Sequence, residues 1–259
     1  MLTIEHLTKS YGGDVKAVDD LSITVLPGDI YGFIGHNGAD KTTTLRAVAG
    51  ILSFDSGTIR VNGKNITQDP IACKREMAYI PDNPDLYDHL TGIQYLNFVA
   101  DIYGVSESDR EERIKYYADA FEMTPRLNDL IASCSHGMKQ KIAVISALIH
   151  KPKLLLLDEP FVGLDPKAAH TLKGFMKELC DNGSAIFFST HVLEVAEKLC
   201  NKIAIITGGR LVTAGDMVTA RARSSWRPRT SREFWPRRHM LMARITASSR
   251  CLEVSAVAK

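Results

Sequence analysis

The stretch Gly35-His36-Asn37-Gly38-Ala39-Asp40-Lys41-Thr42-Thr43 decides the fold. It matches the phosphate-binding pattern G-x-x-x-x-G-K-[ST] at every required position except the second glycine, where Asp40 stands. In such a loop, backbone N–H groups and a helix N-terminus surround the phosphates, the lysine reaches the β- and γ-phosphates, and the next hydroxyl binds magnesium. The pattern therefore predicts a site for a nucleotide and Mg²⁺, with Lys41 and Thr42 in these roles.

The segments on either side of the loop support this prediction. Residues 28–34 read as a short apolar strand that enters the loop, and residues 42–50 as the helix that leaves it, with Gly50 as its C-cap. Strand–loop–helix is the frame that a phosphate loop requires. Asp40 conflicts with that frame, because it puts a carboxylate beside a polyanion and a side chain where the backbone approaches the phosphates. Taken alone, the loop leaves open a glycine-rich turn of an unrelated α/β protein.

A second motif, Leu154-Leu155-Leu156-Leu157-Asp158-Glu159-Pro160, joins an apolar run to two carboxylates. A buried strand of a parallel sheet would present both acids at its C-terminal edge, beside the phosphate loop. There Asp158 would hold magnesium through water, and Glu159 would polarise the attacking water. The alternative is a core strand with a solvated acidic end. The stretch Gly163-Leu164-Asp165-Pro166 that follows favours the catalytic interpretation.

With these motifs in this order, the chain resembles the nucleotide-binding subunits of ATP-binding-cassette (ABC) transporters from about Met1 to Met217. The resemblance implies an α/β fold of the P-loop NTPase type, an ABC cassette core with an antiparallel β region and a helical subdomain. It implies ATP and Mg²⁺ as ligands. It also implies that the nucleotide is bound by the phosphate-loop residues Gly35, Asn37, Gly38, Lys41, Thr42 and Thr43.

The resemblance assigns roles to residues outside the phosphate loop as well. Tyr11 matches the aromatic residue that stacks on adenine, although it also fits an ordinary surface aromatic. Asp82 stands where the family usually has a glutamine that contacts magnesium and water, so it is a candidate metal ligand and catalytic residue. His191, after the apolar run 185–188, matches the switch histidine; the alternative is a capping or core histidine.

Two further loops are expected at the interface between two subunits. Ser135-His136-Gly137-Met138-Lys139-Gln140 is similar to the family's signature loop, usually Ser-Gly-Gly-Gln. In the family, Ser135 and Gly137 would face the γ-phosphate bound by the partner, and Ser135 would also cap the helix that starts at Met138. Asp165 matches the loop that crosses the dimer interface. We interpret His136 and Asp82 as marks of an exporter-type branch.

Three regions are expected. Residues 1–72 and 152–217 would form the nucleotide-binding α/β core, with antiparallel strands at 2–7, 17–25 and 57–61. Residues 73–151 would form the helical signature subdomain, with helices at 92–103 and 108–121, and would contact transmembrane partners. Residues 218–259 would be a tail with no tertiary role.

The tail differs from the rest of the chain in composition. Residues 220–259 contain ten arginine or lysine residues against two glutamates, and both tryptophans of the chain. A basic arm for nucleic acid or anionic lipid, and a disordered tail, both fit this composition. We favour a third interpretation, coding DNA read out of frame. Permitted codons for residues 221–247 can be chosen so that a neighbouring register gives a helix-forming segment followed by an acidic tail. The DNA sequence would settle this point and the identity of Asp40.

Composition is consistent with a cytoplasmic protein. The chain has 259 residues, 45% of them hydrophobic, which suffices for a substantial core. It has no apolar run of about 18 residues and no cleavable leader, so no bilayer span is expected. Its five cysteines are scattered, which fits reduced thiols, and its eight histidines form no ligand cluster.

These observations predict an ATP-binding and ATP-hydrolysing subunit that energises an ABC transporter, an exporter, through dimer closure on ATP. Its partners would be a second cassette subunit and separate transmembrane permease subunits, at the cytoplasmic side of the cell membrane, and no nucleic acid. Two alternatives stay open: a catalytically impaired or regulatory copy, because of Asp40, and a soluble non-transport ABC ATPase. The last usually carries tandem cassettes or long coiled coils, which this chain lacks.

Overall fold

A computed structural model describes residues 1–12 and 15–217 of the chain. The expected tail, residues 218–259, lies outside the described residues, and so do the predictions made for it. In the part of the chain that the structure describes, no helix is both long enough and apolar enough to cross a membrane.

The first sheet is antiparallel and holds most of the N-terminal segment. It contains β1 (Leu2–Ser10), β2 (Lys16–Val25), β4 (Ser56–Val61) and β5 (Lys64–Asn65), in the order β2-β1-β4-β5. Leu2 lies opposite both Val25 and Val61, and all three side chains are buried. This alternation of buried and exposed positions is what one packed face and one solvated face require. The antiparallel region predicted from residues 2–7, 17–25 and 57–61 is confirmed.

The second sheet is mostly parallel and carries the loop quoted above. Its order is β10-β9-β3-β8-β7-β6, made of β3 (Ile30–Ile34), β6 (Met77–Ile80), β7 (Leu154–Asp158), β8 (Ala185–Thr190), β9 (Lys202–Thr207) and β10 (Arg210–Asp216). Only β10 pairs antiparallel. The strands β3, β7 and β8 are buried along their whole length, as expected of parallel strands covered on both faces.

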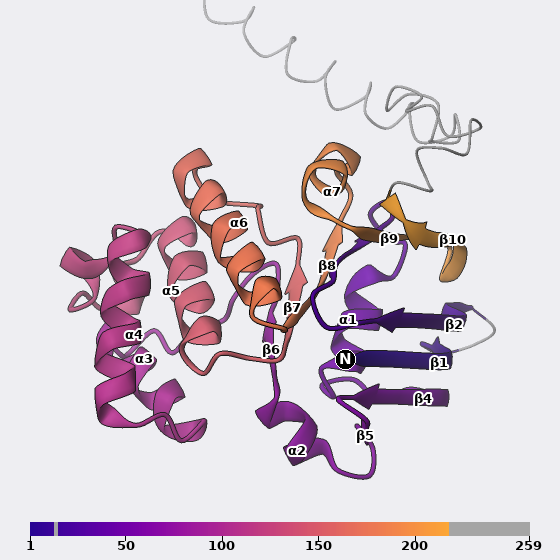
Figure 1. Cartoon of the computed structure of the whole chain (residues 1–259), viewed down its shortest axis with the longest axis horizontal. Helices are drawn as coiled ribbons and strands as arrows, with labels where there is room; N and C mark the ends of the chain where they lie inside the picture. The colour runs from indigo at the N-terminus through magenta and orange to yellow at the C-terminus, as the bar shows by residue number, and fades with distance from the viewer. Residues whose placement is uncertain (13–14, 218–259) are drawn as a thin grey trace, which may run out of the picture. The chain divides into compact units, whose positions relative to one another are not determined.

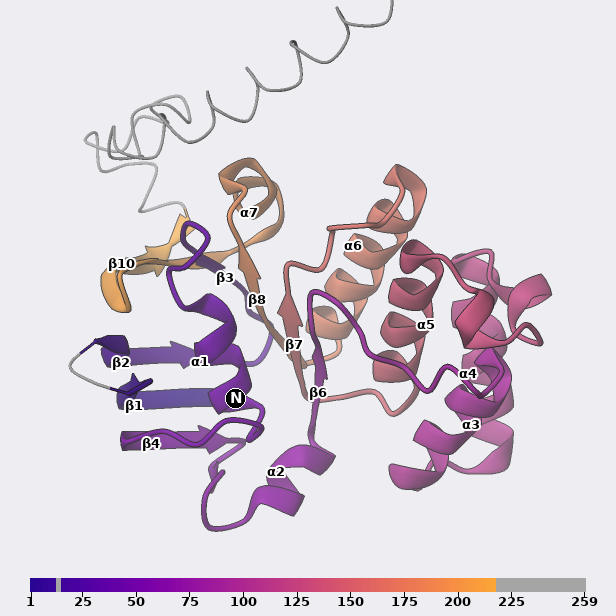
Figure 2. The ribbon, with the colours of Figure 1, turned by 180° about the vertical axis from the view of Figure 1, so that it is seen from behind.

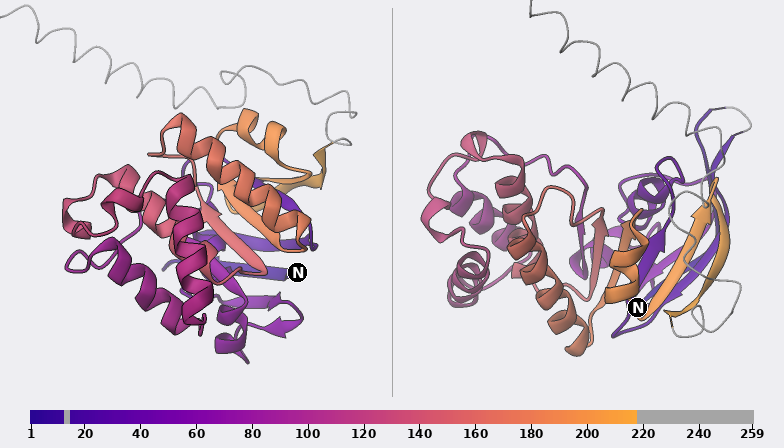
Figure 3. Two further views of the ribbon diagram at one scale, coloured as in Figure 1. Left: turned by 60° about the vertical axis from the view of Figure 1, so that its left-hand side comes forward. Right: turned by 90° about the horizontal axis from the view of Figure 1, so that it is seen from above.

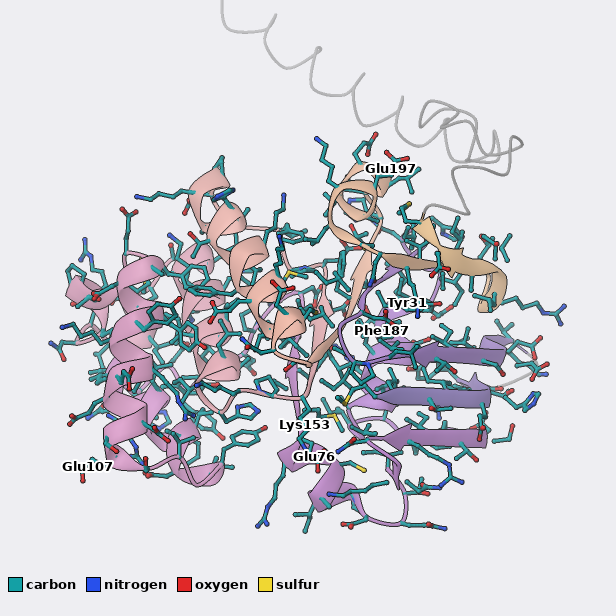
Figure 4. The ribbon with its side chains drawn as sticks, viewed as in Figure 1. Tyr31, Glu76, Glu107, Lys153, Phe187 and Glu197 are labelled. Carbon is teal, nitrogen blue, oxygen red and sulfur yellow. The ribbon has the colours of Figure 1, made fainter. Side chains whose placement is uncertain are left out.

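Alternate residues of these strands face two different layers. Tyr31, Phe33 and Phe187 belong to the core between the two sheets, and the rings of Tyr31 and Phe187 lie 5.8 Å apart (Figure 4). Gly32 faces the other way, where an added Cβ would lie 3.4 Å from Ala196 of α7 (Leu193–Leu199). On the inner side α1 (Lys41–Val48) packs between the sheets, against β2, β7 and β8.

The helices gather beyond β6 and β7. These elements are α3 (Gly92–Ile102), α4 (Glu107–Ala120), the short η1 (Thr124–Arg126) and η2 (Ile131–Ser133), and α5 (His136–Ile149). They lie at the end opposite to β1, β2 and β4, with β6, β7 and β8 between (Figure 1, Figure 2). The helix α6 (Pro166–Asp181) lies beside α5 in every view (Figure 3). The elements α2 (Pro70–Arg75) and β6 precede this group.

Side-chain caps explain where several helices begin. Thr91 forms a capping box with Gln94 at α3, and the hydroxyl of Ser106 accepts from the Asp109 amide at α4. Ser135 and Asp165 cap α5 and α6 in the same way. The helices predicted at 92–103 and 108–121 correspond to α3 and α4, and each end agrees to within one residue.

Three predicted boundaries need correction. The strand β6 lies within the segment 73–151 that we expected to be helical, yet it pairs with β7 and so belongs to the core sheet. The helix α5 begins at His136, ahead of the predicted Met138, because Ser135 is the cap. The C-cap of α1 is Ala49, and Gly50 follows it with a left-handed φ of 65°.

Candidate active site

A cavity of about 600 Å³ lies where the carboxyl ends of β3, β7 and β8 meet the N-terminus of α1. Ligands bind at this edge in open α/β sheets. The cavity contains nine of the residues that the sequence predicts, from four separate segments: Asn37, Gly38, Lys41, Thr42, Thr43, Asp82, Asp158, Glu159 and His191. Asp40, Asn83, His136 and Val162 also line it.

The loop between β3 and α1 wraps around the side chain of Lys41. The Lys41 ammonium donates to the backbone carbonyls of Gly35 and His36, at 2.8 and 3.2 Å, and its side chain is almost fully buried. Gly35 has no space for a side chain, because a Cβ there would lie 2.8 Å from Ile206. Glycine at position 35 therefore lets the loop pack closely against Ile206, and Gly35 does not itself line the cavity.

Asp40 is the N-cap of α1 and has left-handed backbone angles, φ 61° and ψ 31°. This is the region that glycine adopts freely and that costs other residues roughly 1 kcal/mol or more, which explains why the loop pattern asks for glycine here. The Asp40 carboxylate accepts a long hydrogen bond from the Thr43 hydroxyl, at 3.4 Å. Partial burial raises the pKa of Asp40, while the Thr43 contact and the nearby His36 lower it.

Tyr11 lies at the outer edge of this loop and does not line the cavity. Its hydroxyl is 3.4 Å from that of Thr43, and its side chain is largely exposed. An exposed aromatic ring at the edge of a phosphate loop fits the predicted stacking on a base, and it fits an ordinary surface aromatic equally well.

Asp158 is the deepest acid of the cavity, with 1% of its surface exposed. One carboxylate oxygen accepts from the Ser189 hydroxyl at 2.5 Å, and the other has no hydrogen-bond partner among the described residues. Burial is the main cause that raises the pKa of Asp158; the nearby hydroxyls of Ser189 and Thr42 oppose it. A buried carboxylate oxygen that lacks a partner is costly unless a cation or water satisfies it.

The donor set therefore fits Mg²⁺. A carboxylate oxygen of Asp158 beside the Thr42 hydroxyl offers the few hard oxygen ligands that Mg²⁺ takes from protein, with phosphate and water supplying the rest. Among residues 1–12 and 15–217, no group of three or more His, Cys, Asp or Glu side chains is arranged to hold a metal ion by itself. Such a site would depend on a bound phosphate.

Glu159 follows Asp158 with a left-handed φ of 47°, which turns its carboxylate away from the strand and toward the phosphate loop. Its backbone N–H donates to Ser189 Oγ at 3.0 Å. Its Oε1 atom lies 3.0 Å from His191 Nδ1 and 3.5 Å from Lys41 Nζ. The predicted water-activating carboxylate thus contacts both the predicted switch histidine and the predicted phosphate-binding lysine.

The remaining predicted residues lie around the cavity. Asp82 lines the cavity and is exposed, with its carboxylate accepting from the Asn83 amide at 2.9 Å. Ser135 and Gly137 form the N-terminus of α5, and Asp165 that of α6; none of the three lines the cavity. An ion pair of 2.8 Å between Asp165 and Lys141 connects the two helix starts and is the main cause that lowers the pKa of Asp165.

Sequence reasoning missed two residues of the site. Ser189 pairs with Asp158 in the register of β7 and β8, and its hydroxyl holds both Asp158 and the backbone of Glu159. The only signal was a hydroxyl residue at the end of an apolar strand. His136 was interpreted as a mark of a subfamily, yet it lines the same cavity as Lys41 and Glu159.

Known proteins resemble this chain in sequence and in fold. Residues 18–162 match the protein family described as ABC transporter. The chain is 36% identical over 217 residues to the ABC-type transporter ATP-binding protein EcsA of Bacillus subtilis, covering 84% of this chain and 87% of EcsA. It is 34% identical over 215 residues to the linearmycin resistance ATP-binding protein LnrL of the same organism, covering 83% of this chain and 69% of LnrL.

Solved structures show the same fold. An ATP-binding subunit of an ABC transporter superposes with a TM-score of 0.83 at 35% identity, over 87% of this chain and 93% of that one. The ATP-binding cassette MJ0796, solved as a dimer in a post-hydrolysis state with ADP and Pi, superposes with a TM-score of 0.77. It covers 84% of this chain and 99% of MJ0796, and at 20% identity it supports the fold alone.

Proposed function

The chain belongs to the ABC transporter family as an ATP-binding subunit, and from this premise we propose that it binds ATP with Mg²⁺, hydrolyses it and energises an exporter. The observation that carries the proposal is the convergence of Lys41, Thr42, Asp158, Glu159 and His191 in one cavity. These residues come from separate segments, and each has the chemistry that phosphoryl transfer to water requires.

Each of these residues has a separate role in hydrolysis. Lys41 and the N-terminus of α1 hold the β- and γ-phosphates, where Lys41 exchanges its loop carbonyls for phosphate oxygens. Magnesium, when bound by Thr42 and Asp158, neutralises charge on those phosphates. Glu159 orients the attacking water and accepts its proton. His191, 3.0 Å from Glu159, keeps that carboxylate turned toward the γ-phosphate.

We further propose that two such subunits close on two ATP molecules. Ser135 and Gly137 begin α5, so the free N–H groups there can meet a phosphate held by a second copy. MJ0796, which has the same fold, was itself solved as a dimer. Asp165 would lie at the same interface, beside the start of α6.

We propose separate transmembrane subunits as the remaining partners, which would hold the chain at the cytoplasmic side of the membrane. The helices of residues 92–149 are the proposed contact. The names of two relatives support export: LnrL is a linearmycin resistance protein, and the Nod factor export ATP-binding protein I of Cupriavidus metallidurans is 34% identical over 215 residues. That relative matches 83% of this chain and 71% of its own length.

A second candidate function is an impaired or regulatory copy of such a subunit. It is favoured by one observation, the carboxylate of Asp40 in the wall of the phosphate cavity with glycine-like backbone angles. In this case the chain would still dimerise with a competent cassette, and the partner's site would supply the turnover.

ATP hydrolysis by the unaltered chain, measured beside Asp40→Gly, separates the two candidates, and its dependence on protein concentration tests the proposed closure. We expect Asp40→Gly protein to hydrolyse ATP with a rate that rises with the square of its concentration, and Glu159→Gln on the same background to elute as a dimer with ATP–Mg. At saturating ATP–Mg, turnover by the unaltered chain would support the hydrolysing subunit, and turnover by Asp40→Gly alone would support the impaired copy. A monomer that hydrolyses ATP at a rate linear in its concentration would contradict the proposed closure.

A further inference from the structure

The hydroxyl of Ser189 lies beside the two acids at the end of β7. Ser189 is fully buried, and its strand β8 is hydrogen-bonded to β7 on one side and to β3 on the other. Asp158 and Phe33 stand opposite Ser189 in these two pairings. A residue in the middle of a sheet cannot shift without breaking its ladders. The fold therefore fixes where the Ser189 hydroxyl lies.

This hydroxyl makes one hydrogen bond as an acceptor and one as a donor. The backbone N–H of Glu159 donates to Ser189 Oγ at 3.0 Å. Ser189 Oγ in turn donates to Asp158 Oδ1 at 2.5 Å. An ionised carboxylate can only accept, so the hydroxyl hydrogen has to point at Asp158. Oδ1 of Asp158 is thereby engaged within the protein.

The other carboxylate oxygen of Asp158, Oδ2, is in the opposite situation. It is buried and has no hydrogen-bond partner among the described residues, although Asp158 lines the cavity. The Thr42 hydroxyl is close to this carboxylate, and the negative charges of Asp82 and Glu159 act on it. A buried oxygen in such surroundings requires a cation, or a water held by one. Only one oxygen of Asp158 is available for it.

The number of available oxygens bears on which cation fits. Mg²⁺ is small, demands a near-ideal octahedron and keeps several of its waters in phosphate sites. Ca²⁺ takes about six to eight oxygen ligands and often uses both oxygens of one carboxylate. A carboxylate whose Oδ1 is engaged by a hydroxyl cannot bind in that bidentate way. Asp158 as it stands therefore suits Mg²⁺, directly or through a bound water, better than Ca²⁺.

We propose that Ser189 is a positioning residue that sets the metal preference of the nucleotide site. By holding Oδ1, Ser189 presents Asp158 to the cation through Oδ2 alone, and this favours Mg²⁺ over the larger Ca²⁺. The hydrogen bond from Glu159 keeps the hydroxyl pointed at Asp158, so the backbone of the proposed base takes part in the same arrangement. This inference rests on the proposed binding of a nucleotide with Mg²⁺.

Calorimetric titration of ADP into the full chain measures this preference without using turnover. Each protein is titrated in saturating Mg²⁺, in saturating Ca²⁺ and in EDTA, both unaltered at position 40 and with Asp40→Gly. We expect Mg²⁺ to raise the affinity for ADP more than Ca²⁺ does. Ser189→Ala frees Oδ1, so the ratio of the Mg²⁺ to the Ca²⁺ affinity should fall at least about threefold. Its affinity in EDTA should change by less than about twofold, because Ser189 acts through the cation.

Three further variants show whether the hydroxyl itself is responsible. Ser189→Thr keeps the hydroxyl and should keep the ratio within about twofold of the original value. Ser189→Cys nearly keeps the size but donates only weakly, so its ratio should lie between those of the unaltered chain and Ser189→Ala. Ser146→Ala, the matched control, removes a buried hydroxyl outside this cavity and should leave the ratio unchanged. Each ratio compares two titrations of one protein, so a partial loss of folding lowers both affinities alike.

The outcomes separate the inference from the proposal on which it rests. If Mg²⁺ supports binding of ADP and Ser189→Ala leaves the ratio unchanged, Ser189 does not set the metal preference and the inference is wrong. The same holds if Ser189→Ala lowers the affinity equally in Mg²⁺, Ca²⁺ and EDTA, since Ser189 would then only support the fold. If neither metal raises the affinity for ADP even in Asp40→Gly, the proposed binding of nucleotide with metal fails, and both statements fall.

Discussion

Lys41 Nζ lies 3.5 Å from Glu159 Oε1, so the residue proposed to bind phosphate contacts the residue proposed to activate water. Both side chains are mostly buried, which makes their attraction stronger than that of a surface ion pair. Phosphate oxygens arriving at Lys41 would compete with Glu159 for the ammonium. Binding of nucleotide would thereby release the carboxylate toward water at the step that needs it.

Hydrolysis should depend on Glu159 and His191 much more than binding does. On an Asp40→Gly background, we expect Glu159→Gln and His191→Ala each to reduce turnover to background, because water is no longer oriented or deprotonated. Their ATP affinities should stay within a few-fold, since neither residue cradles the phosphates. Phosphate release and equilibrium titration measure the two quantities. Full turnover in Glu159→Gln would point to another base, with Asp82 as the next candidate.

Ser189→Ala should destabilise the protein by about 1–3 kcal/mol, because it leaves the buried carboxylate of Asp158 without its hydrogen-bond donor. Urea unfolding measures this loss. Ser146→Ala is the matched control: its buried hydroxyl donates to the uncharged Ala143 carbonyl of its own helix and contacts the Tyr95 side chain, so its loss should be smaller. Equal losses in the two variants would show that Ser189 does not support Asp158.

His150 should make stability fall in mildly acidic solution. It is stacked on Tyr103 at 3.7 Å, and burial lowers its pKa to about 4. In the unfolded chain the pKa of His150 is near 6.5, so the unfolded state binds the proton first as the pH falls. The contribution of His150 to the free energy of unfolding is therefore fully present above about pH 6.5 and is lost as the pH falls toward 4. Between pH 7.5 and 5 the loss should be about 2 kcal/mol.

Comparison with His150→Gln isolates this contribution from that of the other titrating groups. Urea unfolding of both proteins at pH 7.5 and 5.0 gives two differences, and the unaltered chain should have the larger one. Parallel pH dependences would mean that His150 is not the group responsible.

Local patterns in the sequence predicted the elements that carry the site. The loop from Gly35 to Thr43 and the strand ending in Asp158 and Glu159 are encoded by contiguous residues, so their type and order could be predicted. The neighbours of Asp158 could not, because β8 pairs with β7 by long-range register and brings Ser189 beside the acid. The strand β6 could not be predicted for the same reason. It lies within a mostly helical segment and forms because it pairs with β7.

The contact between His136 and Gly163 could not be predicted from local sequence patterns either. The two residues are far apart in the sequence and approach only because α5 and α6 start side by side, fixed by Lys141 and Asp165. The backbone angles of Asp40, by contrast, follow directly from the glycine that the loop pattern requires at its position.

We expect this chain to have an assembled ATP site whose affinity is limited by Asp40. A carboxylate within about 4 Å of a phosphate charge costs on the order of 4 kcal/mol at an effective dielectric near 20, which is roughly a thousandfold in affinity. Asp40→Asn keeps the size of the side chain and removes its charge, so it should recover most of that factor.

The most direct measurement is a calorimetric titration of ATP–Mg into the unaltered chain and into Asp40→Gly, at the same pH and salt. We expect Asp40→Gly to bind ATP roughly a thousandfold more tightly, and Lys41→Ala on that background to abolish the gain. Equal affinities of the unaltered chain and Asp40→Gly would contradict it.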